Sequence, residues 1–186
     1  PIKSLEIENK KLQNNPNGVG CIARFKFATE GFDKLVVTTA LSPTSLEGAQ
    51  KNLQAEAKTD DFDAVRRQAE TLWNKELGRI EIEGASKSQE TVFYTSLYHA
   101  MSAPTLLCDV DGTYLGADRK LHKADGWNNY ETCSLWDTYR AAHPLYDILM
   151  PARAGEMVNS LIAFSKENGR LPIWNMWSSE TDMMIG

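Results

Sequence analysis

Hydrophobic and polar positions alternate with period two in the first part of the chain. The alternation runs from Gly20 to Ala28 and resumes over residues 35–41, after a turn at Glu30-Gly31. Period two is typical of strands, so we predict two antiparallel strands here, with Leu5–Ile7 as part of a third. An isolated hairpin is marginally stable in water. We therefore expect these strands to need partners that this chain does not supply.

After Pro43 the apolar spacing changes to three and four residues, which is typical of amphipathic helices. We predict helices that begin near Thr44, Asp60, Ser86, Ser134 and Pro151. Thr44 with Glu47 and Ser86 with Gln89 have the spacing of capping boxes. We expect the fourth helix to run to Leu149 with a bend at Pro144, and the fifth to end at a left-handed cap at Asn168-Gly169.

Between the third and fourth predicted helices the pattern is irregular. Residues 106–115 predict a hairpin that turns at Asp111-Gly112, a favoured turn pair. Residues 116–130 show no periodicity and predict a long surface loop, and such loops are often functional.

The change from strands to helices predicts a mixed fold. We expect strands over residues 1–44, a helical linker over 45–84, and a helical domain over 85–186 that belongs to an α/α barrel or bundle. The apolar residues 183–186 read as the start of a further element. We therefore expect the chain to be part of a longer protein.

Charge and composition exclude several classes of function. The net charge is -5 and Lys and Arg form no cluster, which argues against nucleic-acid binding. No run reaches the roughly 18 apolar residues of a membrane span, and the polar opening of the chain is no signal peptide. The 3 cysteines form no CxxC spacing and are predicted to be buried free thiols rather than zinc ligands.

Most familiar site motifs are absent. The segment that begins at Asp109 lacks the glycine and glutamate of a calcium loop, because Tyr114 and Lys120 stand at those positions, so we interpret it as a plain turn. The three histidines have no metal-site spacing and are interpreted as structural. No serine-hydrolase or nucleotide-binding motif occurs.

Asp137 is the strongest candidate for chemistry. It follows Trp136, and a carboxylate beside an aromatic ring suits a sugar, which offers hydroxyls and an apolar face. The alternative is an ion pair with Arg140 at i, i+3 of one helix. Glu180 is a second acid, in a Ser-Ser-Glu-Thr turn where a glutamate is usually a cap. Two acids that bracket a cleft would suit glycoside hydrolysis.

A series of sequence blocks resembles glycoside hydrolase family 92, the calcium-dependent, inverting exo-α-mannosidases common in glycan-degrading bacteria. Upstream, residues 41–49 and 61–65 match more loosely. The order and spacing of the blocks over residues 90–186 make the resemblance specific. The blocks are Phe93-Tyr-Thr-Ser-Leu-Tyr-His99, Ala103-Pro-Thr-Leu106, Asp109 to Gly116, Ser134-Leu-Trp-Asp-Thr-Tyr-Arg140 with His143-Pro144, Gly169 to Trp174, and Glu180-Thr with Met184-Ile-Gly186.

The resemblance implies an N-terminal β-sandwich that ends in residues 1–44, a helical linker, and the first helices of an incomplete (α/α)6 barrel. It implies that Asp137 binds the terminal mannose, with Trp136 and Arg140 as flanking supports. Glu180 belongs to a motif that in the family usually reads Gly-Asn-Glu-Thr and here reads Ser-Ser-Glu-Thr, which puts its exact role in doubt.

The resemblance also implies what this chain lacks. The family's general acid, base aspartates and calcium ligands lie in later blocks, so we expect no catalytic or metal-binding residue here and an inactive chain. The parent protein would be a secreted or periplasmic bacterial enzyme that removes terminal, α-1,2-linked mannose from glycans. The alternative left open is a helical domain that binds carbohydrate without turnover. The sequence decides neither the leaving sugar nor the oligomeric state.

Overall fold

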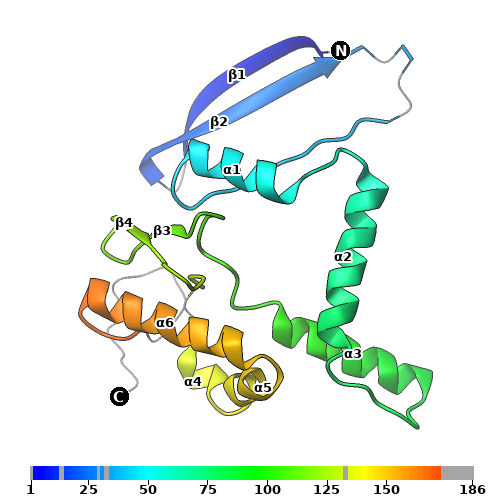
Figure 1. Ribbon diagram of the computed structural model, residues 1–186. Coiled ribbons are helices and arrows are strands. Elements are labelled where there is room, and N and C mark those ends of the chain that lie inside the picture. The colour runs from blue at the N-terminus through cyan, green and yellow to red at the C-terminus, as the bar shows by residue number, and fades with distance from the viewer. Residues whose placement is uncertain (1, 13–14, 29, 32–33, 132–133, 173–186) are drawn as a thin grey trace. The chain divides into compact units, whose positions relative to one another are not determined.

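The computed structural model describes residues 2–12, 15–28, 30–31, 34–131 and 134–172 of the chain. It divides into two compact units, residues 1–37 and 38–186. The fold is mixed, as predicted, with helices and two small antiparallel sheets (Figure 1). The domain boundaries predicted at residues 44 and 84 stay predictions.

The first unit is built on one hairpin. Strand β1 (Ile2–Leu12) pairs antiparallel with β2 (Asn15–Phe27), with Leu5 opposite Phe25. Cross-strand ion pairs lie on the hairpin at 3.0 Å each, Arg24–Glu8 and Lys26–Glu6. The apolar side chains stay exposed, Leu5 at 49% and Phe25 at 50%. The hairpin thus has an apolar face without cover from the described residues of its own unit.

The prediction of a strand over residues 35–41 is wrong. This segment forms no strand, and Leu35, Val36 and Val37 are 60%, 51% and 72% exposed. The β-branched side chains favour a pleated, half-buried surface. A strand also needs a neighbour for its backbone hydrogen bonds, and β2 finds that neighbour in β1 instead.

The first three helices begin where local capping chemistry favours them. Helix α1 (Leu46–Glu56) is capped by Ser45 rather than by the predicted Thr44, because the Ser45 hydroxyl accepts from the Gly48 N–H at 3.0 Å. Helix α2 (Phe62–Leu77) is capped by Asp61. Helix α3 (Lys87–Met101) has the predicted capping box of Ser86 and Gln89.

The predicted hairpin over 106–115 is replaced by another pairing. Strand β3 (Thr113–Leu115) pairs with β4 (Leu121–Lys123), which lies inside the segment predicted to be a loop. The turn at Asp111-Gly112 is present, since Gly112 has φ 82°. It directs β3 toward β4, whereas Leu106 makes an isolated bridge to Tyr130. Pairing partners depend on tertiary contacts that local turn signals do not specify.

The fourth predicted helix is two helices, α4 (Leu135–Thr138) and α5 (Ala142–Leu149). Pro144 does not bend a continuous helix but lies in the first turn of α5. A proline has no N–H to donate and clashes with the carbonyl four residues earlier, so it is tolerated in a first turn and not in a helix interior. Helix α6 (Pro151–Asn168) begins at proline and ends at Gly169 with φ 79°, both as predicted.

The core of the second unit lies where α3, α5 and α6 meet. Its centre is buried Leu97, Met101, Tyr130, Tyr146, Met150, Ala154 and Met157, with Trp73 and Leu77 of α2 packed against it. The Tyr146 hydroxyl donates to the carbonyls of Ala100 and Ala103 at 2.8 and 2.9 Å, which joins α5 to the end of α3.

Two sequence interpretations concern cysteines and membranes. Cys108 is a free thiol, as predicted, but it is half-buried rather than buried, and partial burial raises its pKa. The side chains of Cys21 and Cys133 lie outside the described part of the chain. Among the described helices, none combines the length and the apolar character that a bilayer crossing requires.

Candidate functional site

The predicted sugar-binding residues fall on and beside the short helix α4. Asp137 lies on α4, and its side chain is exposed. Trp136 also lies on α4, but its side chain is outside the described part of the chain, as is the whole of Glu180. The structure therefore places Asp137 and Arg140 on one segment and does not show how either lies relative to Glu180.

The proposed ion pair between Asp137 and Arg140 is not present among the described residues. Arg140 turns to its neighbour instead: its Nε donates to the Tyr139 hydroxyl at 2.7 Å, and its guanidinium lies 5.4 Å from the centre of that ring. The Asp137 carboxylate is thus exposed and available to a ligand. This observation removes the simplest structural explanation for Asp137.

A buried carboxylate ties helix α1 to the turn before β3. Asp109 is 3% exposed and accepts hydrogen bonds from the Ser42 hydroxyl at 2.9 Å, from the Thr44 hydroxyl, and from Asn52 Nδ2 at 2.7 Å. Burial alone would raise its pKa, but these three donors outweigh burial and hold the pKa below the usual value. Asp109 is therefore more than the turn residue that the sequence suggested.

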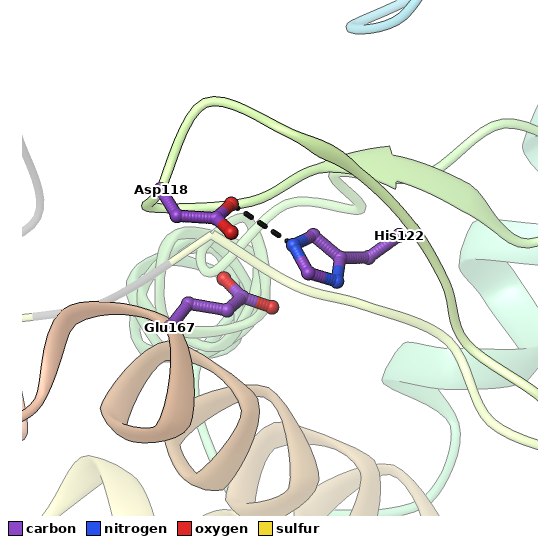
Figure 2. A group of neighbouring side chains, drawn as sticks. All are labelled: Asp118, His122 and Glu167. Carbon is purple, nitrogen blue, oxygen red and sulfur yellow. Dashed lines mark hydrogen bonds and ion pairs between the residues drawn. The ribbon is translucent and has the colours of Figure 1, made fainter.

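A second group of polar side chains joins the β3–β4 hairpin to the end of α6 (Figure 2). Asp118, His122 and Glu167 present ligand-type atoms within 4.8 Å of one another. Asp118 Oδ1 lies 2.9 Å from His122 Nε2, and this hydrogen bond, with one from the Lys120 N–H, lowers the pKa of Asp118. Sequence reasoning missed the group, because Glu167 is 45 residues beyond His122 in the chain.

Glu167 is held by both of its oxygens. Oε1 accepts from the Tyr114 hydroxyl at 2.7 Å, and Oε2 accepts from the Ala117 N–H at 2.9 Å. Burial and the bond to Glu167 raise the pKa of Tyr114. The backbone at Gly116 passes so close that a Cβ there would lie 2.6 Å from His122 Cδ2. These contacts make a hydrogen-bonded clasp between the hairpin and α6.

This clasp does not suit calcium, the metal implied by the family resemblance. Calcium takes six to eight oxygen ligands, whereas the clasp offers an imidazole nitrogen and two carboxylates. Both Glu167 oxygens and the Asp118–His122 pair are already engaged within the protein. The clasp is the one such group found in the described part of the chain, so no calcium site is assigned to these residues.

Solved structures share the fold of this chain. It aligns with the family GH92 alpha-mannosidase BT3965 from Bacteroides thetaiotaomicron at 39% identity and a TM-score of 0.70, over 78% of this chain and 20% of that one. The same mannosidase has also been solved in complex with mannoimidazole, and there the match covers 19% of that chain. The family GH92 inverting mannosidase BT2199 from Bacteroides thetaiotaomicron VPI-5482 aligns at 25% identity and a TM-score of 0.74, over 94% of this chain and 24% of that one.

The chain spans about a fifth of the length of the first of these relatives. A search of curated proteins gives no match. The model of the glycosyl hydrolase family 92 catalytic domain matches residues 48–186, which is most of the chain and includes α4 and its aspartate. With this match and the structural likeness at 39% identity, the chain belongs to glycosyl hydrolase family 92.

Proposed function

We propose that this chain is part of an α-mannosidase that removes terminal α-linked mannose, with a preference for α-1,2 linkages and with inversion. The observation that carries the proposal is the match of residues 48–186 to the family's catalytic domain, together with 39% identity to a solved α-mannosidase. The general acid, the base and the calcium ligands belong, in this proposal, to sequence outside the 186 residues. By itself the chain is then inactive.

Within that enzyme Asp137 binds the hydroxyls of the terminal mannose. A carboxylate accepts two such hydrogen bonds, and the bonds are strong because the acceptor is charged. Its exposure and its freedom from Arg140 among the described residues support this role. Trp136, Arg140 and Glu180 are proposed as neighbours of the same sugar. They stay proposals on the basis of the family's sequence blocks.

Inverting glycoside hydrolysis requires two carboxyl groups on opposite faces of the sugar ring. In inverting hydrolysis one carboxyl group protonates the departing oxygen, and another activates a water on the opposite face of the ring. Asp137 would orient the sugar between them without exchanging a proton. Loss of Asp137 is therefore expected to weaken binding of the mannoside and its transition state together.

The test uses the complete open reading frame that contains this sequence. We expect Asp137→Ala to lower kcat/KM for an α-1,2-mannobioside by on the order of 100-fold, since a hydrogen bond to a charged group contributes about 1.5–3 kcal/mol. Asp125→Ala is the matched control, because Asp125 is an exposed aspartate beyond β4, and this variant should keep wild-type kinetics.

The outcomes separate the alternatives. Unchanged turnover in Asp137→Ala would leave that residue without a role in the subsite. A full-length protein that binds mannosides but never releases mannose would instead support the carbohydrate-binding alternative. Mannose release by the 186-residue chain alone, at rates typical of enzymes, would contradict the proposed location of the catalytic groups.

A further inference from the structure

Helix α4 is too short to hold its own position. It spans four residues, and Ser134 at its N-terminus makes no side-chain capping bond. Helices of this length are unstable alone, because one turn of hydrogen bonds does not offset the cost of ordering the backbone. The place of Asp137 therefore depends on contacts beyond the hydrogen bonds of α4 itself.

The segment before α4 is fastened to helix α6 by a single carboxylate. Glu156 Oε1 accepts from the Asn128 N–H at 3.3 Å and from Asn128 Nδ2 at 3.0 Å. Its Oε2 accepts from the Tyr130 hydroxyl at 3.3 Å. One half-buried side chain thus receives three hydrogen bonds from two residues of this segment.

One turn further along α6 a second group continues the attachment. The Ser160 hydroxyl, 4% exposed, accepts from the Tyr130 N–H at 2.9 Å and donates to the Glu156 carbonyl at 3.0 Å. Positions 156 and 160 lie on one face of the helix, four residues apart. The face therefore positions both the backbone and the side chain of Tyr130, which is itself 8% exposed in the core.

The opposite edge of the segment is held by residues that follow α3. The Leu107 N–H donates to the Asn129 carbonyl at 2.8 Å, and the Glu131 N–H donates to the Thr105 carbonyl at 2.9 Å. Residues 128–131 are therefore fixed between these backbone bonds and α6. Helix α4 begins four residues after Glu131.

We infer that Glu156 is a positioning residue: by holding Asn128 and Tyr130 it fixes residues 128–131, which precede α4 in the chain, and through them it affects the place of Asp137. The inference rests on the proposed function, since Asp137 is the residue that would contact the sugar. Glu156 itself touches no substrate in this account. Its loss is expected to displace the subsite rather than to remove a group from it.

The same helix provides a matched control. Glu167 also accepts two hydrogen bonds, from Tyr114 and Ala117, but it fastens the β3–β4 hairpin and not the segment before α4. Loss of either glutamate removes comparable contacts from α6. Only the loss of Glu156 should displace Asp137.

The experiment compares Glu156→Ala, Glu156→Gln, Tyr130→Phe and Glu167→Ala in the full-length protein. We expect Glu156→Ala to raise KM for the α-1,2-mannobioside on the order of tenfold, because small misplacements of binding groups are costly. Glu156→Gln retains an acceptor for Asn128 and should restore most of the affinity. Glu167→Ala should lower the thermal midpoint about as much as Glu156→Ala does and leave KM unchanged.

A double mutant tests the route of the effect. If Glu156 acts through Asp137, adding Glu156→Ala to Asp137→Ala should change KM much less than it does in the wild type. Wild-type KM in Glu156→Ala, or an equal rise in KM in Glu167→Ala, would overturn the inference. Tyr130→Phe removes one of the three bonds without a change of shape, so it tests the inference if Glu156→Ala does not fold. A wild-type KM in Tyr130→Phe would also contradict the inference. A wild-type enzyme that releases no mannose would instead overturn the proposed function.

Discussion

At the residue scale, two aspartates differ from what their sequence context predicts. Asp109 reads as an ordinary turn aspartate in the sequence, yet three donors from residues 42–52 converge on it. The spacing of Asp137 and Arg140 allows an ion pair as the alternative to a sugar-binding role, yet Arg140 bonds to Tyr139 instead. In both cases the residue type was informative, but its partner was decided by the fold.

The Asp109 network predicts a pH-dependent stability. Its folded pKa lies below the usual value of about 3.9, so its contribution is complete above that pH and is lost as the pH falls through the folded pKa. We expect Asp109→Asn to lower the free energy of unfolding at pH 7 by about 2 kcal/mol, because buried donors lose their charged acceptor. Urea denaturation at pH 7 and at lower pH measures this.

The difference between wild type and Asp109→Asn should shrink as the pH falls below about 4, because the carboxylate of the unfolded chain takes up a proton there while the folded pKa lies lower. Asp125→Asn, which changes an exposed aspartate, should match the wild type at every pH. A difference that is constant down to the lowest pH would show that the network does not depend on the charge of Asp109.

At the scale of elements, helix positions were predictable and pairings were not. Ser86 and Gln89 cap α3, and Pro151 and Gly169 bound α6, because capping uses contacts within three or four residues. The partner of β3 depends on which segment lies beside it, and this was wrong in the prediction. The division of α4 from α5 follows from Pro144, which the sequence pattern predicts to bend a single helix.

Two helical glycines should respond to alanine with opposite sign. A Cβ at Gly48 of α1 would collide with Asp109 Oδ2 and lie 2.5 Å from the Ser42 hydroxyl, whereas a Cβ at Gly155 of α6 meets nothing within 4 Å. We expect Gly48→Ala to destabilise by about 1–3 kcal/mol through steric strain. Gly155→Ala should stabilise by about 0.5–1 kcal/mol through helix propensity. Chemical denaturation of the two variants checks both, and a stabilising Gly48→Ala would mean that α1 does not pack on Asp109 as described.

At the scale of the whole molecule, many large apolar side chains are exposed and the buried core is small. In the described part of the chain no large side chain is less than 2% exposed, and Ile148, Phe62 and Val92 are 77%, 69% and 64% exposed. Buried apolar area is the main source of folding free energy. The isolated 186-residue chain is therefore expected to be only weakly stable.

The exposed apolar side chains should be detectable by dye binding and by thermal unfolding. We expect the isolated chain to bind a hydrophobic dye such as ANS at neutral pH and to unfold over a broad temperature range, since a small core gives low cooperativity. Fluorescence titration and scanning calorimetry would record the two properties. A single sharp transition without dye binding would show that the core around Tyr146 is sufficient by itself.

The sequence by itself determined the mixed class of the fold, most helix ends and the family, because capping residues, periodicity and ordered sequence blocks are local and can be read along the chain. It also singled out Asp137. Only the tertiary structure showed that Arg140 leaves Asp137 unpaired among the described residues, that β3 pairs with β4, and that Glu156 and Glu167 fasten different segments to one helix. These depend on residues far apart in sequence, whose contacts follow from packing rather than from any spacing along the chain.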